Sequence, residues 1–150
     1  MTITISTHDD AQPEASAVVD QGLGDANDAA APLHEVRPLR CFARDAAGRV
    51  VGGAVGRTWG GCCELQQLWV DPARRRAGLG AALVRAFEAH AAARGCTDAY
   101  LETFNFQAPG LYAALGYTVA HTLGVFPHGI VRHLMVKRLP ATPGARRTPA

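Results

Sequence analysis

The sequence LWVDPARRRAGLGAALVRAFEAHAAARG, residues 68–95, carries the strongest local pattern in this chain of 150 residues. An apolar run stops at Asp71-Pro72, and an Arg-Arg-Arg run then leads into a Gly-Leu-Gly step. From Leu79 onward, apolar residues recur every four positions, which predicts a helix over residues 79–94 with Gly95 as its C-terminal stop. The stretch therefore predicts a strand, a tight turn and a helix in direct succession.

Positive charge and glycine at the start of a helix suit an anion. The first N–H groups of a helix lack internal partners, the helix dipole is positive there, and glycine lets a ligand approach the backbone. A phosphate or pyrophosphate is the natural guest, although a plain tight turn beside solvated arginines is the alternative. A dinucleotide fingerprint would need glycine where Leu83 stands, and a Walker loop would need Lys and then Ser or Thr at Ala81 and Ala82.

The remaining sequence predicts a mixed α/β chain. A helix is expected to begin near Pro13 and to end at Gly22 and Gly24. The segment over 24–36 is loop-like; the alternatives are that it extends the helix or lines a site. A short helix is predicted over 108–116. Alternating or β-branched runs predict strands over 2–6, 39–44, 49–58, 62–70, 98–104, 117–123 and 130–139. This order indicates one domain over 1–139 and a mobile tail over 140–150.

Composition excludes several classes of protein. Hydrophobic residues make up 48% of the chain, enough for a core, and the net charge of +2 does not favour nucleic-acid binding. The four cysteines form no C-x-x-C pair, and no histidine pair has zinc-ligand spacing, so we expect reduced thiols, no metal site and a cytoplasmic location. Neither a signal peptide nor an apolar run of the ~20 residues that a membrane helix needs is found.

Residues 68–95 resemble the signature segment of the GNAT N-acetyltransferase superfamily, whose R/Q-x-x-G-x-G/A motif is matched by residues 75–80. LETFNFQAPGLYAALGYTV (101–119) and IVRHLMVKRL (130–139) resemble later segments of the family, so that the resemblance covers about residues 36–139. It implies a central mixed, mostly antiparallel sheet that is splayed into a V and flanked by helices, with acetyl-CoA in the cleft.

The resemblance also implies which residues bind the coenzyme. The pyrophosphate would lie on the N–H groups around Arg76 to Ala81, and the main chain of Leu68 and Val70 would hold the thioester carbonyl. The implied coenzyme contacts are Leu68, Trp69, Val70, Arg75, Arg76, Ala77, Gly78, Leu79, Gly80, Ala81, Asn105, Ala108 and Tyr112. For Asn105 the alternative is a helix cap.

Two side chains are candidates for acid–base catalysis. Tyr112 matches the family tyrosine near the coenzyme sulfur, and a phenol of pKa ~10 can protonate a departing thiolate; the alternative is a packed aromatic. Glu64 is the candidate base, because an alkylamine of pKa ~10.4 is protonated at neutral pH. Strand alternation would place Glu64 on the same side as Leu68 and Val70; the alternative is a surface or salt-bridged carboxylate. Tyr117 is expected in the core.

The predicted function is transfer of an acetyl group from acetyl-CoA to a primary amine of a small molecule. Direct attack in a ternary complex is expected, because no histidine has a visible nucleophile partner. A protein or peptide N-acetyltransferase and a non-catalytic acyl-CoA-binding module are the alternatives. The acidic residues Asp20, Asp25, Asp28 and Glu35 either attract the amine or are solvated. By resemblance we expect a homodimer; the acceptor's identity and the roles of His121 and His128 are not predicted.

Overall fold

The computed structural model describes residues 1–140, and the expected mobile tail lies outside the described residues from position 141 on. The chain divides into two compact units, Met1–Glu35 and the remainder from Val36. In chain order the elements are α1 (Pro13–Ala30), a 3-10 turn (Leu33–Glu35), β1 (Arg37–Arg44), β2 (Val50–Trp59), β3 (Cys62–Val70), a second 3-10 turn (Pro72–Arg74), α2 (Leu79–Ala93), β4 (Asp98–Phe104), α3 (Pro109–Ala114), β5 (Thr118–Leu123) and β6 (Arg132–Arg138).

The first unit differs from the sequence prediction in two ways. Helix α1 begins at Pro13, as expected, but Gly22 and Gly24 do not end it, because a mid-helix glycine costs only about 1 kcal/mol against its helix-forming neighbours. It continues to Ala30, so the alternative that the following segment extends the helix holds for residues 24–30. Residues 2–6 form no strand, and the isoleucines among them are exposed. An alternating β-branched pattern becomes a strand only where another strand offers hydrogen bonds. The single domain over 1–139 stays a prediction.

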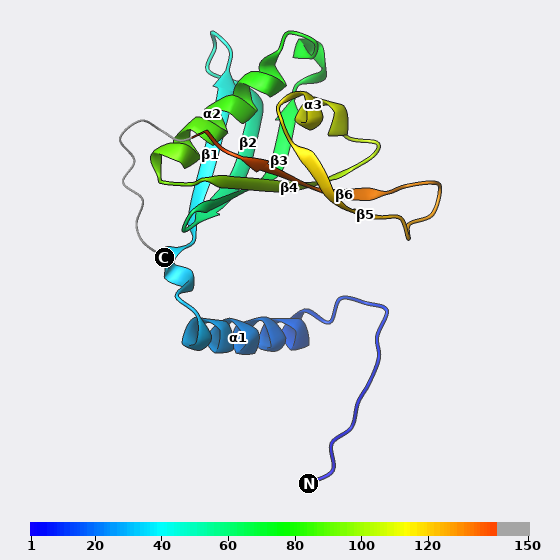
Figure 1. The fold of residues 1–150 in the computed structure, drawn as a ribbon. Coiled ribbons are helices and arrows are strands. Elements are labelled where there is room, and N and C mark those ends of the chain that lie inside the picture. Colours follow the sequence, from blue (N-terminus) through cyan, green and yellow to red (C-terminus); the bar gives the residue numbers. More distant parts are fainter. Residues whose placement is uncertain (141–150) are drawn as a thin grey trace. The chain divides into compact units, whose positions relative to one another are not determined.

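The second unit is built on a six-stranded sheet with the order β1-β2-β3-β4-β6-β5. Every neighbouring pair is antiparallel except β3 and β4, which are parallel because α2 connects them. Helices α2 and α3 lie on the same side of the sheet, which we call the helix face; the other side is the open face (Figure 1). The predicted mixed, mostly antiparallel sheet is confirmed, and its strands form within two residues of the predicted bounds.

The core lies between α2 and the helix face. The predicted apolar row of α2 is confirmed, because Leu83, Phe87 and Ala91 are buried, and Gly95 ends the helix with φ 94°. Glu88 follows Phe87 and so stands outside this row, yet it is only 8% exposed. Its carboxylate is stabilised there because Lys137 Nζ donates to Oε1 at 2.8 Å, and Tyr117 Oη donates to Oε2 at 2.9 Å.

Strand β3 loses one of its two partner strands in its middle. Its parallel pairing with β4 ends at Leu65 and Leu101. At the same point a β-bulge interrupts its pairing with β2, since Gly56 pairs with Leu65 whereas Val55 pairs with Gln67. The residue between them, Gln66, has no partner on β2, and β3 diverges from β4 beyond it. The bulge and the loss of pairing together make the fork that opens the sheet.

Glycine at position 56 is required by close packing at this bulge. A Cβ there would overlap the carbonyl oxygen of Glu64 and would lie 2.8 Å from Phe87 Cζ. We predict that Gly56→Ala lowers the free energy of unfolding by about 3 kcal/mol, measured by urea unfolding with circular dichroism. Gly61→Ala is the matched control, because the nearest atom to its added Cβ, Thr97 Oγ1, is 3.6 Å away. Equal midpoints for the two variants would contradict the assignment.

Candidate active site

The fork between β3 and β4 opens into a cleft of about 950 Å³. Beyond Leu65 the edge of β3 that faces β4 is no longer paired with that strand, so its backbone N–H groups are available to a ligand. The lining residues are Leu65, Gln66, Gln67, Leu68, Trp69, Val70, Arg74, Arg75, Arg76, Gly78, Leu79, Gly80, Ala81, Glu102, Thr103, Phe106, Gln107, Ala108, Leu111 and Tyr112. The cleft therefore collects the end of β3, the start of α2, the end of β4 and α3.

The start of α2 forms one wall of this cleft. Gly78 is its N-cap, with a left-handed φ of 75°, and its carbonyl oxygen accepts the Ala82 N–H at 3.0 Å. The N–H groups of the first turn, up to Ala81, precede the first intrahelical bond and have no partner within the helix. Since these residues line the cleft, their N–H groups and the positive end of the helix dipole create a site for an anion.

The arginine run extends this anion site. Arg75 Nε donates to the carbonyl oxygen of Val70 at 3.2 Å, which fixes the run to the end of β3. Arg74 Nη2 lies 3.7 Å from Asp45 Oδ2. Arg76 has a positive φ of 68°, an uncommon conformation for a non-glycine residue that reverses the chain into Gly78. All three arginines line the cleft, so the loop is both positively charged and held in place.

Tyr112 lines the cleft from α3 and is only 7% exposed. Its ring meets the Tyr117 ring edge to face, with centroids 5.9 Å apart. Burial raises the pKa of the Tyr112 phenol, so the hydroxyl keeps its proton at neutral pH. The expectation that Tyr117 is a core residue is confirmed, because it is buried and donates to Glu88.

Glu64 lies on the open face, which differs from the predicted strand side. Because the bulge inserts Gln66, alternation is shifted by one, and Glu64 lies on the face opposite to Leu68 and Val70. Arg57 Nε and Tyr100 Oη each donate to its Oε2 at 2.9 Å. The salt-bridged carboxylate that the sequence left as an alternative is thus present, and Glu64 does not line the cleft.

Two of the residues predicted to bind the coenzyme, Ala77 and Asn105, do not line the cleft either. Asn105 instead joins the end of β4 to the β5–β6 loop: its Nδ2 donates to the Gly129 carbonyl oxygen at 3.0 Å, and its Oδ1 accepts the Val131 N–H at 3.2 Å. It is not the cap of α3, whose N-cap is Ala108. Sequence reasoning missed five lining residues: Leu65, Glu102, Thr103, Gln107 and Leu111. The first three lie where the β3–β4 pairing ends, and that end has no local sequence signal.

The cysteine and histidine side chains do not supply a nucleophile to the cleft. None of the four cysteines, all of which lie in the described part of the chain, lines it. Burial raises the pKa of each thiol, and that of Cys63 to about 12, which disfavours the nucleophilic thiolate. His133 Nδ1 lies 2.8 Å from Thr122 Oγ1 within the β5–β6 pair. Within residues 1–140, no group of His, Cys, Asp and Glu has a metal-binding arrangement, and no helix has the length and apolar character to cross a membrane.

The chain is similar to known proteins in sequence and in fold. Residues 6–117 match the acetyltransferase (GNAT) family. The chain is 41% identical over 112 residues to blasticidin-S acetyltransferase of Streptomyces morookaense. The aligned residues cover 72% of this chain and 82% of that protein. A solved structure from Agrobacterium tumefaciens is 30% identical, with a TM-score of 0.77 and coverage of 91% of this chain and 99% of that one.

A Bacillus cereus acetyltransferase structure shares the fold, with a TM-score of 0.73 at 23% identity over 89% of this chain and 98% of that one. The sequence similarity and the fold similarity thus point to the same family. The chain belongs to the acetyltransferase (GNAT) family and is an N-acetyltransferase.

The tyrosines give a pH test of this structure. Burial is the largest cause that raises the pKa of Tyr100, Tyr112 and Tyr117, and Tyr100 reaches about 12. Unfolded phenols titrate near ~10, so above that pH the native protein holds more protons than the unfolded chain. The raised pKa values therefore contribute to the free energy of unfolding, fully below pH ~10, and this contribution is lost as the pH rises. For Tyr100 the loss extends through pH about 12.

We predict that phenolate absorbance at pH ~10 is far below half-maximal in the native protein and near half-maximal in guanidinium. A spectrophotometric titration in both conditions measures this difference. Superimposed native and denatured titration curves would show that the phenols are not buried in solution.

Proposed function

We propose that the protein transfers the acetyl group of acetyl-CoA to a primary amine of a small molecule, with both substrates bound together. One observation carries the proposal: the anion site at the start of α2, the unpaired edge of β3 and the buried phenol of Tyr112 all line one cleft. The relative named blasticidin-S acetyltransferase supports a small-molecule amine as the acceptor. Acetyl-CoA supplies the activated acetyl thioester.

The residues of the cleft fit the coenzyme. Its pyrophosphate suits the first turn of α2, where Gly78 and Gly80 leave the backbone accessible and Arg75 and Arg76 add charge. The unpaired backbone at Leu68 and Val70 can donate N–H groups to the thioester carbonyl. Tyr112 keeps its proton and can donate it to the departing sulfur.

The test is incubation of the protein with acetyl-CoA and a panel of amines that includes blasticidin S, amino acids and short peptides, with acetylated products detected by mass spectrometry. On the best acceptor we expect Tyr112→Phe to lower kcat by about 10²-fold with little change in KM, because the ring stays while the proton donor is lost. Tyr117→Phe is the matched control: it makes the same change in the neighbouring ring, outside the cleft lining. We expect it to keep kcat.

Absence of product from every amine, although acetyl-CoA binds, would overturn the proposed reaction. Acetylation of peptides alone would replace the small molecule with a protein acceptor. Equal kcat for Tyr112→Phe and the wild type would remove the acid role of Tyr112 and leave the reaction in place.

Glu64 is proposed as the base that accepts the amine proton, through water, from the open face. It stands one residue before the end of the β3–β4 pairing. We predict that Glu64→Gln lowers kcat/KM strongly at pH 7 and much less near pH ~10, where the amine loses its proton without help. Arg57→Gln is the matched control, because it breaks the same ion pair and keeps the carboxylate. An equal loss at both pH values would contradict the base role.

A further inference from the structure

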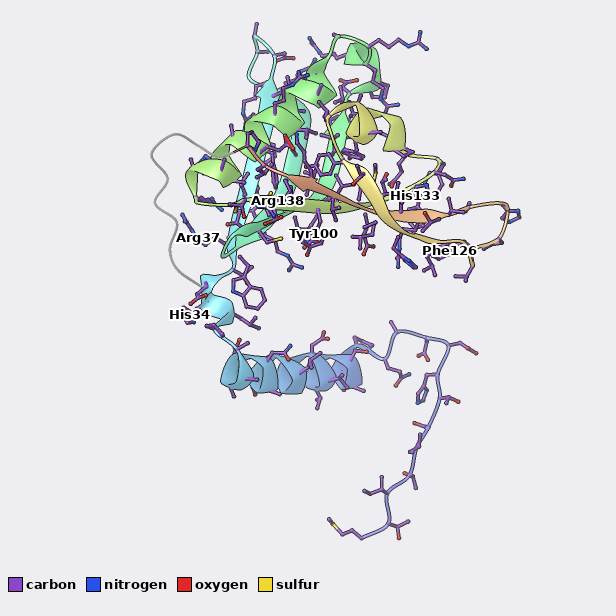
Figure 2. All side chains as sticks on the ribbon, in the orientation of Figure 1. His34, Arg37, Tyr100, Phe126, His133 and Arg138 are labelled. Atoms are coloured by element: carbon purple, nitrogen blue, oxygen red, sulfur yellow. The ribbon has the colours of Figure 1, made fainter. Side chains whose placement is uncertain are left out.

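The cleft reaches both faces of the sheet through the end of β4. Along this strand Leu101 and Thr103 are buried toward the helix face, and by alternation Tyr100, Glu102 and Phe104 lie on the open face. Figure 2 labels Tyr100 and Phe126, both on the side of the sheet away from α2 and α3. Glu102 lines the cleft and also a second depression, of about 660 Å³, whose wall includes Tyr100. The fork therefore connects the anion site on the helix face with the open face.

Three phenylalanines stand together where the cleft meets the open face. The Phe104 and Phe106 rings are stacked, with centroids 5.2 Å apart and an interplanar angle of 10°, and Phe126 meets Phe104 edge to face at 5.6 Å. We call these three residues the phenylalanine platform. Phe106 lines the cleft and is 66% exposed. Because Phe104 covers one face of the Phe106 ring, its other face is available to a ligand.

The platform is held by interactions that do not involve a ligand. The Arg132 guanidinium carbon lies 5.7 Å from the centroid of the Phe126 ring, and Arg132 Nε lies 3.3 Å from Glu102 Oε2. Asn105, which lies between Phe104 and Phe106 in the sequence, is hydrogen-bonded to the β5–β6 loop through its side chain. The rings are thus fixed before a ligand arrives, which reduces the ordering entropy that binding costs.

We propose that the phenylalanine platform is the acceptor subsite and that it binds a planar ring of the amine substrate by stacking on Phe106. This inference rests on the proposed function and names the class of acceptor: a primary amine attached to a flat aromatic or heteroaromatic ring. The anion site at the start of α2 is on the helix face, whereas the platform is on the open face, so the coenzyme and the ring occupy opposite ends of the cleft. Offset stacking of two aromatic rings is favourable, which is why we expect the site to prefer an amine with a flat ring.

The test measures binding, without turnover, of two amines that differ only in the ring. Benzylamine has a planar ring, and cyclohexylmethylamine has the same connectivity with a puckered ring. We expect ligand-observed NMR titration to show roughly 2- to 10-fold tighter binding of benzylamine by the wild type. Phe106→Leu should abolish this preference and Phe106→Trp should keep it. Phe42→Leu is the matched control, because Phe42 is also exposed, at 51%, on the open face, but on β1 and away from the cleft.

Three results would overturn the inference. The first is equal binding of the two amines by the wild type, and the second is a benzylamine preference that Phe106→Leu leaves intact. The third is a weaker affinity of Phe106→Leu for coenzyme A, which would assign the platform to the coenzyme. The failures of the two proposals are distinguishable: a ring preference without acetylation of any amine would reject only the reaction, and acetylation without a ring preference would reject only the platform.

Discussion

The hydrogen bonds between β3 and β4 stop at Leu65 and Leu101, and the rest of the site depends on that interruption. Backbone groups that leave a sheet pairing must find other partners, so the edge of β3 beyond Leu65 is a natural binding surface. The bulge at Gln66 allows the divergence without breaking the β2–β3 pair, since the register resumes at Gln67. The cleft is therefore a built opening in a continuous sheet, lined by main chain as well as side chains.

Helix α2 links this opening to the core. Its apolar row is buried against the sheet, and its N-terminus is thereby held at the cleft, where its unpaired N–H groups face a ligand. The buried Glu88 binds Lys137 of β6 and Tyr117, so α2 is also joined to the half of the sheet that lies beyond β4. Since Tyr117 packs against Tyr112, a buried charged contact supports the candidate acid on α3.

The groups proposed to take part in binding and reaction lie on both faces of the sheet. Charge for an anion and the protonated phenol are on the helix face, whereas Glu64, Glu102 and the phenylalanine platform are on the open face. In the proposed reaction an acetyl group held at the fork would lie between them, which suits direct transfer across the sheet. The four thiols lie outside the cleft lining and have raised pKa values, so a cysteine intermediate would have no place in this arrangement.

The sequence by itself determined the elements of the second unit and the glycine-rich, positively charged start of α2, because strand alternation, four-residue helical spacing and helix-terminal glycines are local signals. It also pointed to Tyr112, through a segment that resembles a family. It placed Glu64 on the wrong face, since the bulge that shifts the alternation depends on how β3 pairs with β2, where Gly56 closely approaches the backbone of β3. It could not indicate that Glu88 is buried or that residues 2–6 form no strand, because burial and strand pairing depend on distant residues. The platform, formed by Phe104, Phe106 and a ring from the β5–β6 loop, was decided by the tertiary structure for the same reason.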